Sequence, residues 1–209
     1  MERLMLINFN HIVNKYEVPR GIIHIGAHMR EERQAYISNG VTDMLWVEGN
    51  EKIYRNSLLY GVLETELFYN EVIADKDGEV FEFKVTNNGE SSSILDLEKH
   101  KIYHPHIYVT ETIAVKTKRF DTLVKENNVD LSKYNFLNLD IQGAELLALK
   151  GFGDLLSGID YIYTEVNETD IYKDCALIGE IDEYLSDFER VETAMTEFKW
   201  GDALYRRKQ

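Results

Sequence analysis

Small and polar residues gather where short apolar runs of the sequence end. Five apolar runs end in this way. In chain order, the residues at their ends are His24, Gly26, Ala27 and His28 for the first run, Glu48 for the second, Ala74 and Asp75 for the third, Asp140 and Gln142 for the fourth, and Glu165 and Asn167 for the fifth. If the runs are parallel strands, their carboxyl ends meet at one edge of a sheet, where open α/β sheets bind ligands. The sequence therefore predicts one ligand site built from segments far apart in the chain.

Gly26 and Glu48 have the spacing of a nucleoside site. Glu48 follows Gly26 by 22 residues, and an acidic side chain about 20 residues after a glycine turn receives ribose hydroxyls in nucleotide-binding folds. The chain lacks a full G-x-G-x-x-G series, so a nucleoside without a diphosphate suits it better than NAD or FAD. A turn glycine and a solvated glutamate would explain the same two residues.

The elements that position these residues follow an α/β rhythm. Buried strands are expected at 22–25, 44–47, 66–74, 136–139 and 161–163, and helices at the stretch ending near 38 and at 51–63, 120–127, 143–150 and 177–188. Continuous apolar strands separated by helices are typical of a parallel sheet that is covered on both faces.

Two regions depart from that rhythm. Residues 78–118 combine turn signals with alternating apolar residues, which predicts a β insertion over the mouth of the sheet. Residues 188–194 and 203–207 look like two final strands, which indicates an antiparallel edge. Residues 1–20 are expected to form an N-terminal helical segment.

Four motifs, taken in order, resemble the FkbM family of S-adenosylmethionine-dependent methyltransferases. They are HIGAHMRE at 24–31, VE at 47–48, FDTL at 120–123 and NLDIQGAE at 138–145, and the resemblance covers roughly residues 20–207. The sequence departs from the family at five positions. It has His24 where the family usually has an acidic residue, His28 in place of Asn, Arg30 in place of Gly, Gly49 in place of Pro and Gln142 in place of Glu. A degenerate, non-catalytic nucleoside-binding or scaffold domain is therefore an alternative.

The resemblance implies a Rossmann-like class I methyltransferase fold: a seven-stranded, mostly parallel sheet with an antiparallel C-terminal edge strand and helices on both faces. It also implies S-adenosylmethionine as cofactor. The cofactor-binding residues expected from it and from the strand ends are His24, Gly26, Ala27, His28, Glu31, Glu48, Ala74, Asp75, Ser92, Asp140, Gln142 and Glu145.

Methyl transfer to a hydroxyl needs a base, or a metal that lowers the hydroxyl pKa. Asp140 is the expected base, with His104 or His106 of the insertion as alternatives because histidine titrates near neutrality. Asp140, Glu165 and Asn167 would together offer oxygen ligands to Mg²⁺. In the simpler interpretation, Glu165 caps a helix or pairs with a lysine, and the histidines belong to a partly exposed loop.

Composition limits the acceptor and the setting. The 209 residues are 44% hydrophobic, which suits a single folded domain over 1–209, and 23 basic against 37 acidic residues give a net charge of −14. This charge disfavours nucleic acids and anionic membranes.

With one cysteine and no apolar run long enough to span a membrane, we expect a cytoplasmic protein. The expected acceptor is a sugar or glycan, with a protein or small amine as the alternative. The chain could belong to a larger glycan-modifying polypeptide or form a homo-oligomer.

Overall fold

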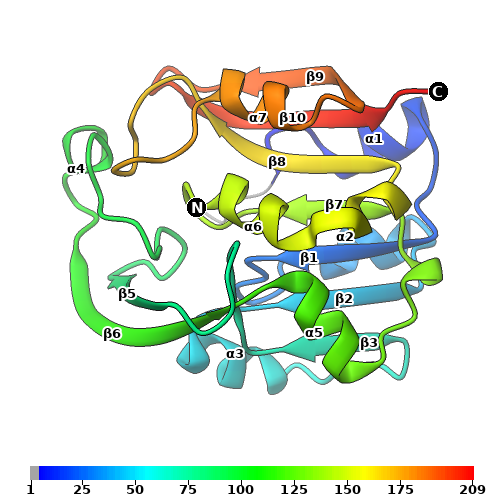
Figure 1. Ribbon diagram of the computed structural model, residues 1–209, viewed down its shortest axis with the longest axis horizontal. Helices are drawn as coiled ribbons and strands as arrows, with labels where there is room; N and C mark the ends of the chain where they lie inside the picture. The colour runs from blue at the N-terminus through cyan, green and yellow to red at the C-terminus, as the bar shows by residue number, and fades with distance from the viewer. Residues whose placement is uncertain (1–4) are drawn as a thin grey trace.

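Seven strands form one sheet in the computed structural model, which describes residues 5–209. Their order is β3-β2-β1-β7-β8-β10-β9, and their bounds are β1 Gly21–Ile25, β2 Asp43–Val47, β3 Glu66–Tyr69, β7 Phe136–Leu139, β8 Tyr161–Asn167, β9 Phe188–Met195 and β10 Trp200–Arg207. Figure 1 shows these strands stacked across the molecule. The predicted seven-stranded α/β sheet is confirmed.

The C-terminal strand runs against its neighbours but does not lie at the edge. Strand β10 pairs antiparallel with β8 on one side and with β9 on the other, so β9 is the edge strand and runs parallel to the rest of the sheet. The hairpin between β9 and β10 turns the chain back into the place beside β8. The predicted antiparallel strand is therefore present, one position further in than expected.

Successive residues of the central strands enter two different cores. Ile23 and Leu45 belong to the core on one face of the sheet, while Ile22 and Trp46 belong to the core on the other. Both faces are buried, which explains the uninterrupted apolar runs.

Helices cover both of these faces (Figure 1). One core takes residues of α5 (Phe120–Asn127), α6 (Glu145–Phe152) and α7 (Ile178–Tyr184), and the other takes residues of α1 (Phe9–Lys15) and α2 (Arg33–Ser38). Helices α3 (Glu51–Leu58) and α7 are shorter than the periodicity predicts. Of the N-terminal segment expected at 1–20, residues 1–4 lie outside the described residues.

A second, three-stranded sheet lies beyond the carboxyl ends of the main strands (Figure 1). It has the order β4-β6-β5, with β4 at Val72–Ile73, β5 at Val80–Thr86 and β6 at Val109–Lys118, and the short helix α4 (His100–Tyr103) precedes β6. This is the predicted insertion, but β4 comes from the run expected to be a single strand at 66–74. The run divides because β4 leaves β2 and pairs with β6.

Two 3₁₀ turns, at Leu131–Lys133 and Gly153–Gly158, complete the described elements. None of the helices in residues 5–209 has the length and apolar character needed to cross a bilayer.

Candidate functional site

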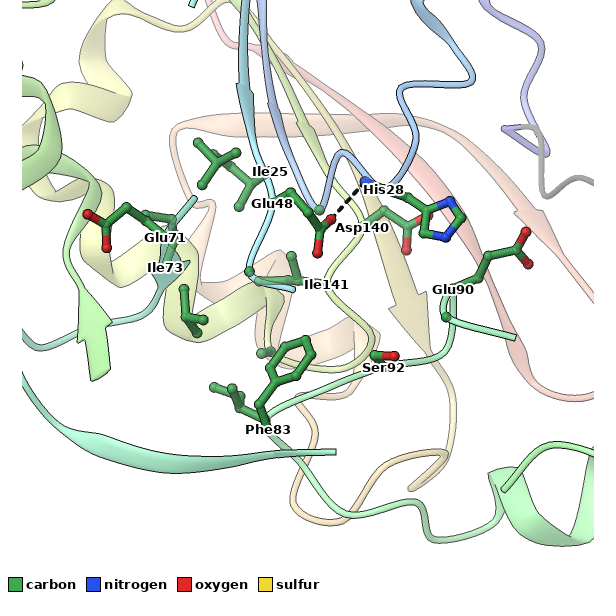
Figure 2. Close-up of a pocket in the computed structure, with 17 residues that line it drawn as sticks. Ile25, His28, Glu48, Glu71, Ile73, Phe83, Glu90, Ser92, Asp140 and Ile141 are labelled. Carbon is green, nitrogen blue, oxygen red and sulfur yellow. Dashed lines mark hydrogen bonds between the residues drawn. The ribbon is translucent and has the colours of Figure 1, made fainter. Parts of the chain in front are cut away.

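A pocket of about 570 Å³ opens where the main sheet meets the second sheet. Figure 2 shows residues from both sheets turned toward it. The lining residues are Ile25, Gly26, His28, Val47, Glu48, Gly49, Glu71, Val72, Ile73, Phe83, Gly89, Glu90, Ser92, Ile94, Asp140, Ile141 and Ala144.

Glu48 is a buried carboxylate directly after β2, held in one orientation by backbone donors. Asn50 N donates to its Oε1 at 2.6 Å, and His28 N donates to its Oε2 at 2.8 Å. Burial raises the pKa of Glu48, and these two N–H groups oppose that rise. Each carboxylate oxygen keeps a second lone pair for a ligand hydroxyl. The side chain points into the pocket (Figure 2).

The loop after β1 requires unusual backbone angles. Gly26 has φ +87°, and a Cβ at this position would lie 1.8 Å from the carbonyl oxygen of Asp140, so only glycine fits. His28 also has positive φ, at 43°. Its Nδ1 lies 2.6 Å from Glu31 Oε1. Burial lowers the pKa of His28, but the bond to Glu31 and the nearby charges of Glu31, Glu48 and Glu90 together outweigh this, and the net shift is upward.

The wall opposite Glu48 is largely apolar. Phe83 of β5 and Ser92 lie on the far side of the pocket from Glu48, with Ile73 and Ile141 between the two sides (Figure 2). The Ser92 hydroxyl accepts a bond from Thr86 N at 3.1 Å, which ties its loop to the end of β5. A carboxylate facing aliphatic and aromatic surface suits a ligand with a planar apolar end and a hydroxylated middle.

Asp140 connects this pocket to a second one. It follows β7, and its backbone N donates to Ile25 O at 3.0 Å, which fixes the end of β7 against β1. The second pocket, of about 370 Å³, shares Gly26, His28, Glu90 and Asp140 with the first and adds His24, Ala27, Glu31 and Glu32. The site thus runs from apolar walls to an acidic end.

The departures at His24 and Arg30 bring no positive charge to the site. His24 is fully buried, and burial lowers its pKa to about 4, so the ring is neutral at neutral pH. Arg30 is buried beneath the loop, where its guanidinium donates to Ser57 Oγ at 2.9 Å, Ser57 O at 2.6 Å and Gly61 O at 2.9 Å. Arg30 therefore fastens the loop to the end of α3 rather than contacting a ligand.

The residues expected to hold Mg²⁺ do not fit a metal. The side-chain nitrogen of Gln142 donates to Asp140 Oδ1 at 2.6 Å and to Glu165 Oε2 at 3.1 Å, and the Tyr172 hydroxyl donates to Gln142 Oε1 at 2.5 Å. An N–H donor lies between the two carboxylates, where a cation would need lone pairs. Within residues 5–209, no group of three or more His, Cys, Asp or Glu side chains could hold a metal ion.

Four other predicted site residues face elsewhere. Gln142 is buried in the network just described and does not line the pocket. Glu145 is buried and accepts from Ile141 N at 3.1 Å and Gly143 N at 3.2 Å, so it supports the turn before α6. Ala74 is fully buried, and the carbonyl of Asp75 accepts from Arg119 Nη1 at 2.8 Å.

His104 and His106 also lie outside the pocket. Their rings are 6.1 Å apart beside α4, and the His104 ring packs edge-on against Phe198 at 5.0 Å. By contrast, Gly26, His28, Glu48, Ser92 and Asp140 line the first pocket, and His24, Ala27 and Glu31 line the second.

The lining residues of the first pocket that the sequence did not predict include Glu71, Ile73 and Phe83. Phe83 belongs to the alternating apolar pattern of the insertion, which marks a strand but not a ligand contact. Glu71 and Ile73 line the pocket in place of Ala74 and Asp75 because the chain turns into the second sheet two residues earlier.

Fold and site together define a Rossmann-like α/β protein with a pocket at the carboxyl ends of its strands, where an acidic residue follows the second strand and a glycine turn follows the first. Residues 21–191 match the family described as "Methyltransferase FkbM domain". The chain therefore belongs to the FkbM methyltransferase family.

One curated relative is similar to this chain over part of its length. The chain is 25% identical over 137 residues to 2-O-methyltransferase NoeI of Sinorhizobium fredii (strain NBRC 101917 / NGR234), a match that covers 63% of this chain and 56% of the relative. The chain thus spans little more than half of that protein.

Two solved structures share the fold at low identity. A protein of the NADB-Rossmann superfamily from Streptococcus agalactiae is 10% identical with a TM-score of 0.52, over 99% of this chain and 69% of the other. A ribosomal protein L11 methylase from Lactobacillus delbrueckii subsp. bulgaricus is 9% identical with a TM-score of 0.50, over 93% and 72%.

Proposed function

We propose that the chain is an S-adenosylmethionine-dependent O-methyltransferase that acts on a hydroxyl of a sugar or glycan. The observation that carries the proposal is Glu48, a buried carboxylate with fixed orientation that faces an apolar wall inside the pocket. Membership of a methyltransferase family supports the reaction class, and the similarity to a 2-O-methyltransferase supports oxygen as the acceptor atom.

In this proposal each part of the cofactor contacts a different part of the pocket. The ribose hydroxyls donate to Glu48, and the adenine lies against Ile73, Phe83 and Ile141. The methionine end then extends toward Asp140 and the second pocket. Among the described residues, those that line the two pockets include no Lys or Arg, which suits a cationic sulfonium better than a phosphorylated nucleotide.

The reaction is an in-line displacement. The acceptor oxygen forms a bond to the methyl carbon as the carbon–sulfur bond breaks, and the sulfur keeps the electron pair of that bond. Asp140 accepts the proton that the hydroxyl loses, because of the two carboxylates that line both pockets, Asp140 and Glu90, it is the one at the end of a central strand, β7. Such general-base assistance contributes about 10²–10⁴-fold, and the positioning of both substrates contributes the rest.

The test is transfer of a labelled methyl group from S-adenosylmethionine to a panel of neutral, amino and acidic sugars, followed by mass spectrometry of the product. A methyl ether on a sugar oxygen is the expected result. Methylation of nitrogen or of added protein would favour the protein or small-amine alternative. Cofactor binding with no transfer to any acceptor would favour a non-catalytic domain.

A further inference from the structure

We propose that His24 donates a hydrogen bond from its Nε2 to the carboxylate of the cofactor's methionine end, and that this bond makes His24 a specificity-determining residue for that carboxylate. The inference rests on the proposed function, in which the methionine end extends into the second pocket. His24 is the fourth residue of β1, and its buried side chain lines that pocket.

Two buried residues determine which nitrogen of His24 carries the proton. Asn138 Nδ2 donates to the Tyr36 hydroxyl oxygen at 2.8 Å, and the same hydroxyl lies 3.3 Å from His24 Nδ1. Because Tyr36 is fully buried, its hydroxyl hydrogen needs an acceptor within the protein. His24 Nδ1 is that acceptor, so in a neutral ring the proton lies on Nε2.

The His24 ring is neutral and has a fixed place. Burial lowers its pKa to about 4, and a neutral imidazole has one donor nitrogen and one acceptor nitrogen. The ring packs among aromatic side chains, with its centroid 5.2 Å from that of Trp46 and 6.2 Å from that of Tyr36. His24 therefore offers one pre-positioned N–H donor, on the nitrogen that does not face Tyr36.

Backbone donors of the loop after β1 are already used. Gly26 N and Ala27 N both donate to Val47 O, at 2.9 and 3.0 Å, and His28 N donates to Glu48 Oε2 at 2.8 Å. A ligand carboxylate in the second pocket therefore depends on side-chain donors.

Side-chain donors are scarce among the described residues that line this pocket. Only two of these residues, His24 and His28, carry an N–H on the side chain. His28 Nδ1 lies 2.6 Å from Glu31 Oε1, and a Cβ on Gly89 would lie 3.2 Å from His28 Nε2, so that nitrogen faces the loop of the second sheet. Ionised carboxylates accept hydrogen bonds and cannot donate them, which applies to Glu31, Glu32, Glu90 and Asp140. His24 Nε2 is thus the donor best placed for the methionine carboxylate.

The test titrates three ligands calorimetrically into the protein at neutral pH. They are S-adenosylhomocysteine, its decarboxylated form, which keeps the amine, and methylthioadenosine, which lacks both groups. We expect His24→Phe to weaken S-adenosylhomocysteine about 10–100-fold, because a hydrogen bond to a charged group is lost. The affinities of the other two ligands should change little, since neither carries the carboxylate.

His24→Gln is the conservative variant, because its amide can present an N–H near the place of Nε2. We expect it to recover most of the S-adenosylhomocysteine affinity that His24→Phe loses. His11→Phe is the matched control: it removes an imidazole from α1, where His11 Nε2 lies 3.0 Å from Glu192 and is half-exposed. It should change none of the three affinities.

Nitrogen NMR of isotope-labelled wild-type protein tests the tautomer without any variant. We expect the free protein to have His24 protonated at Nε2, and S-adenosylhomocysteine to shift that nitrogen more than the decarboxylated ligand does. In Tyr36→Phe the preference for this tautomer should weaken, because the donor to Nδ1 is removed.

Five outcomes would overturn the proposal: protonation of His24 at Nδ1, equal weakening of all three ligands by His24→Phe, no weakening of any, a His24→Gln protein that binds S-adenosylhomocysteine as weakly as His24→Phe, and a wild-type protein that binds S-adenosylhomocysteine no more tightly than methylthioadenosine. The last result would leave the proposed function intact. A wild-type protein that binds none of the three ligands would instead contradict the proposed function itself.

Discussion

Two carboxylates at neighbouring strand ends have different surroundings, and this difference divides their roles. Both oxygens of Glu48 accept backbone N–H bonds, which fix the group for binding. Asp140 is held on one side by the amide of Gln142 at 2.6 Å and lines both pockets of the site. We therefore assign ribose binding to Glu48 and proton transfer to Asp140.

The Asp140→Asn variant tests the second assignment. The amide keeps the shape of the side chain and can still accept from Gln142, but it is too weak a base for a hydroxyl. Turnover should fall by about 10²–10⁴-fold, whereas S-adenosylhomocysteine affinity, measured by calorimetry, should change little. Turnover equal to that of the wild type would remove Asp140 from the proton-transfer step.

Removal of divalent ions tests the interpretation of Gln142. Because the Gln142 amide donates to both Asp140 and Glu165, we expect methyl transfer to proceed at its full rate in excess EDTA. Activity that disappears in EDTA and returns with added Mg²⁺ would show that Gln142 moves aside for a metal. Calcium addition after EDTA treatment serves as a control for non-specific ionic effects.

At the scale of elements, the turn from β7 into α6 determines which polar groups reach the site. Glu145 opens α6 but bends back to Ile141 N and Gly143 N. Burial raises its pKa, and the nearby charges of Glu165 and Asp140 raise it further. This carboxyl group is a support for the turn that holds Asp140, and its protonation is linked to stability.

The sign of that linkage gives a testable pH dependence. A carboxyl whose pKa is raised on folding contributes stability below its unfolded value, near 4.5, and loses it as the pH rises through the folded value. Glu145→Gln keeps the acceptor oxygen and cannot ionise. The free energy of unfolding of the variant should therefore increase relative to that of the wild type as the pH rises, by on the order of 2 kcal/mol.

Chemical denaturation across mildly acidic to mildly alkaline pH measures this difference. A difference in unfolding free energy that stays constant with pH would contradict the link between Glu145 protonation and stability. Glu180→Gln, at the N-terminus of α7 on the surface, provides a matched control: its Oε2 accepts from Leu177 N at 2.8 Å.

The same elements show how far the sequence predicts the fold and site. Apolar runs with both faces buried identified the central strands, and the strand-end residues Gly26, Glu48 and Asp140 line one pocket. The break between β3 and β4 could not be predicted, because it depends on pairing of Ile73 with Lys118, far along the chain. The directions of the Gln142 and Glu145 side chains could not be predicted from the sequence either, because they depend on a turn in which Gln142 has positive φ.

At the scale of the whole molecule, the excess of acidic residues acts together with the shape of the site. A net charge of −14 surrounds pockets whose described lining has no Lys or Arg. The second sheet covers the carboxyl ends of the main strands (Figure 1) and supplies Phe83 and Ser92 to the first pocket. This arrangement disfavours a polyanionic acceptor.

Nucleic acids should therefore neither bind nor accept a methyl group. Fluorescence anisotropy with single- and double-stranded DNA and RNA should show no binding at physiological salt, because binding to a phosphate backbone requires basic contacts. Binding that weakens steeply with added salt would contradict this expectation.

The central claim is that Glu48 holds the ribose of S-adenosylmethionine, and calorimetric titration with S-adenosylhomocysteine tests it most directly. The account predicts one site per chain in the wild-type protein, and a large loss of affinity in Glu48→Ala, since two charge-assisted hydrogen bonds of about 1.5–3 kcal/mol each are removed. Glu71→Ala, which removes a carboxylate from the rim of the same pocket, should bind nearly as well as the wild type. A folded Glu48→Ala protein with unchanged affinity would contradict the account.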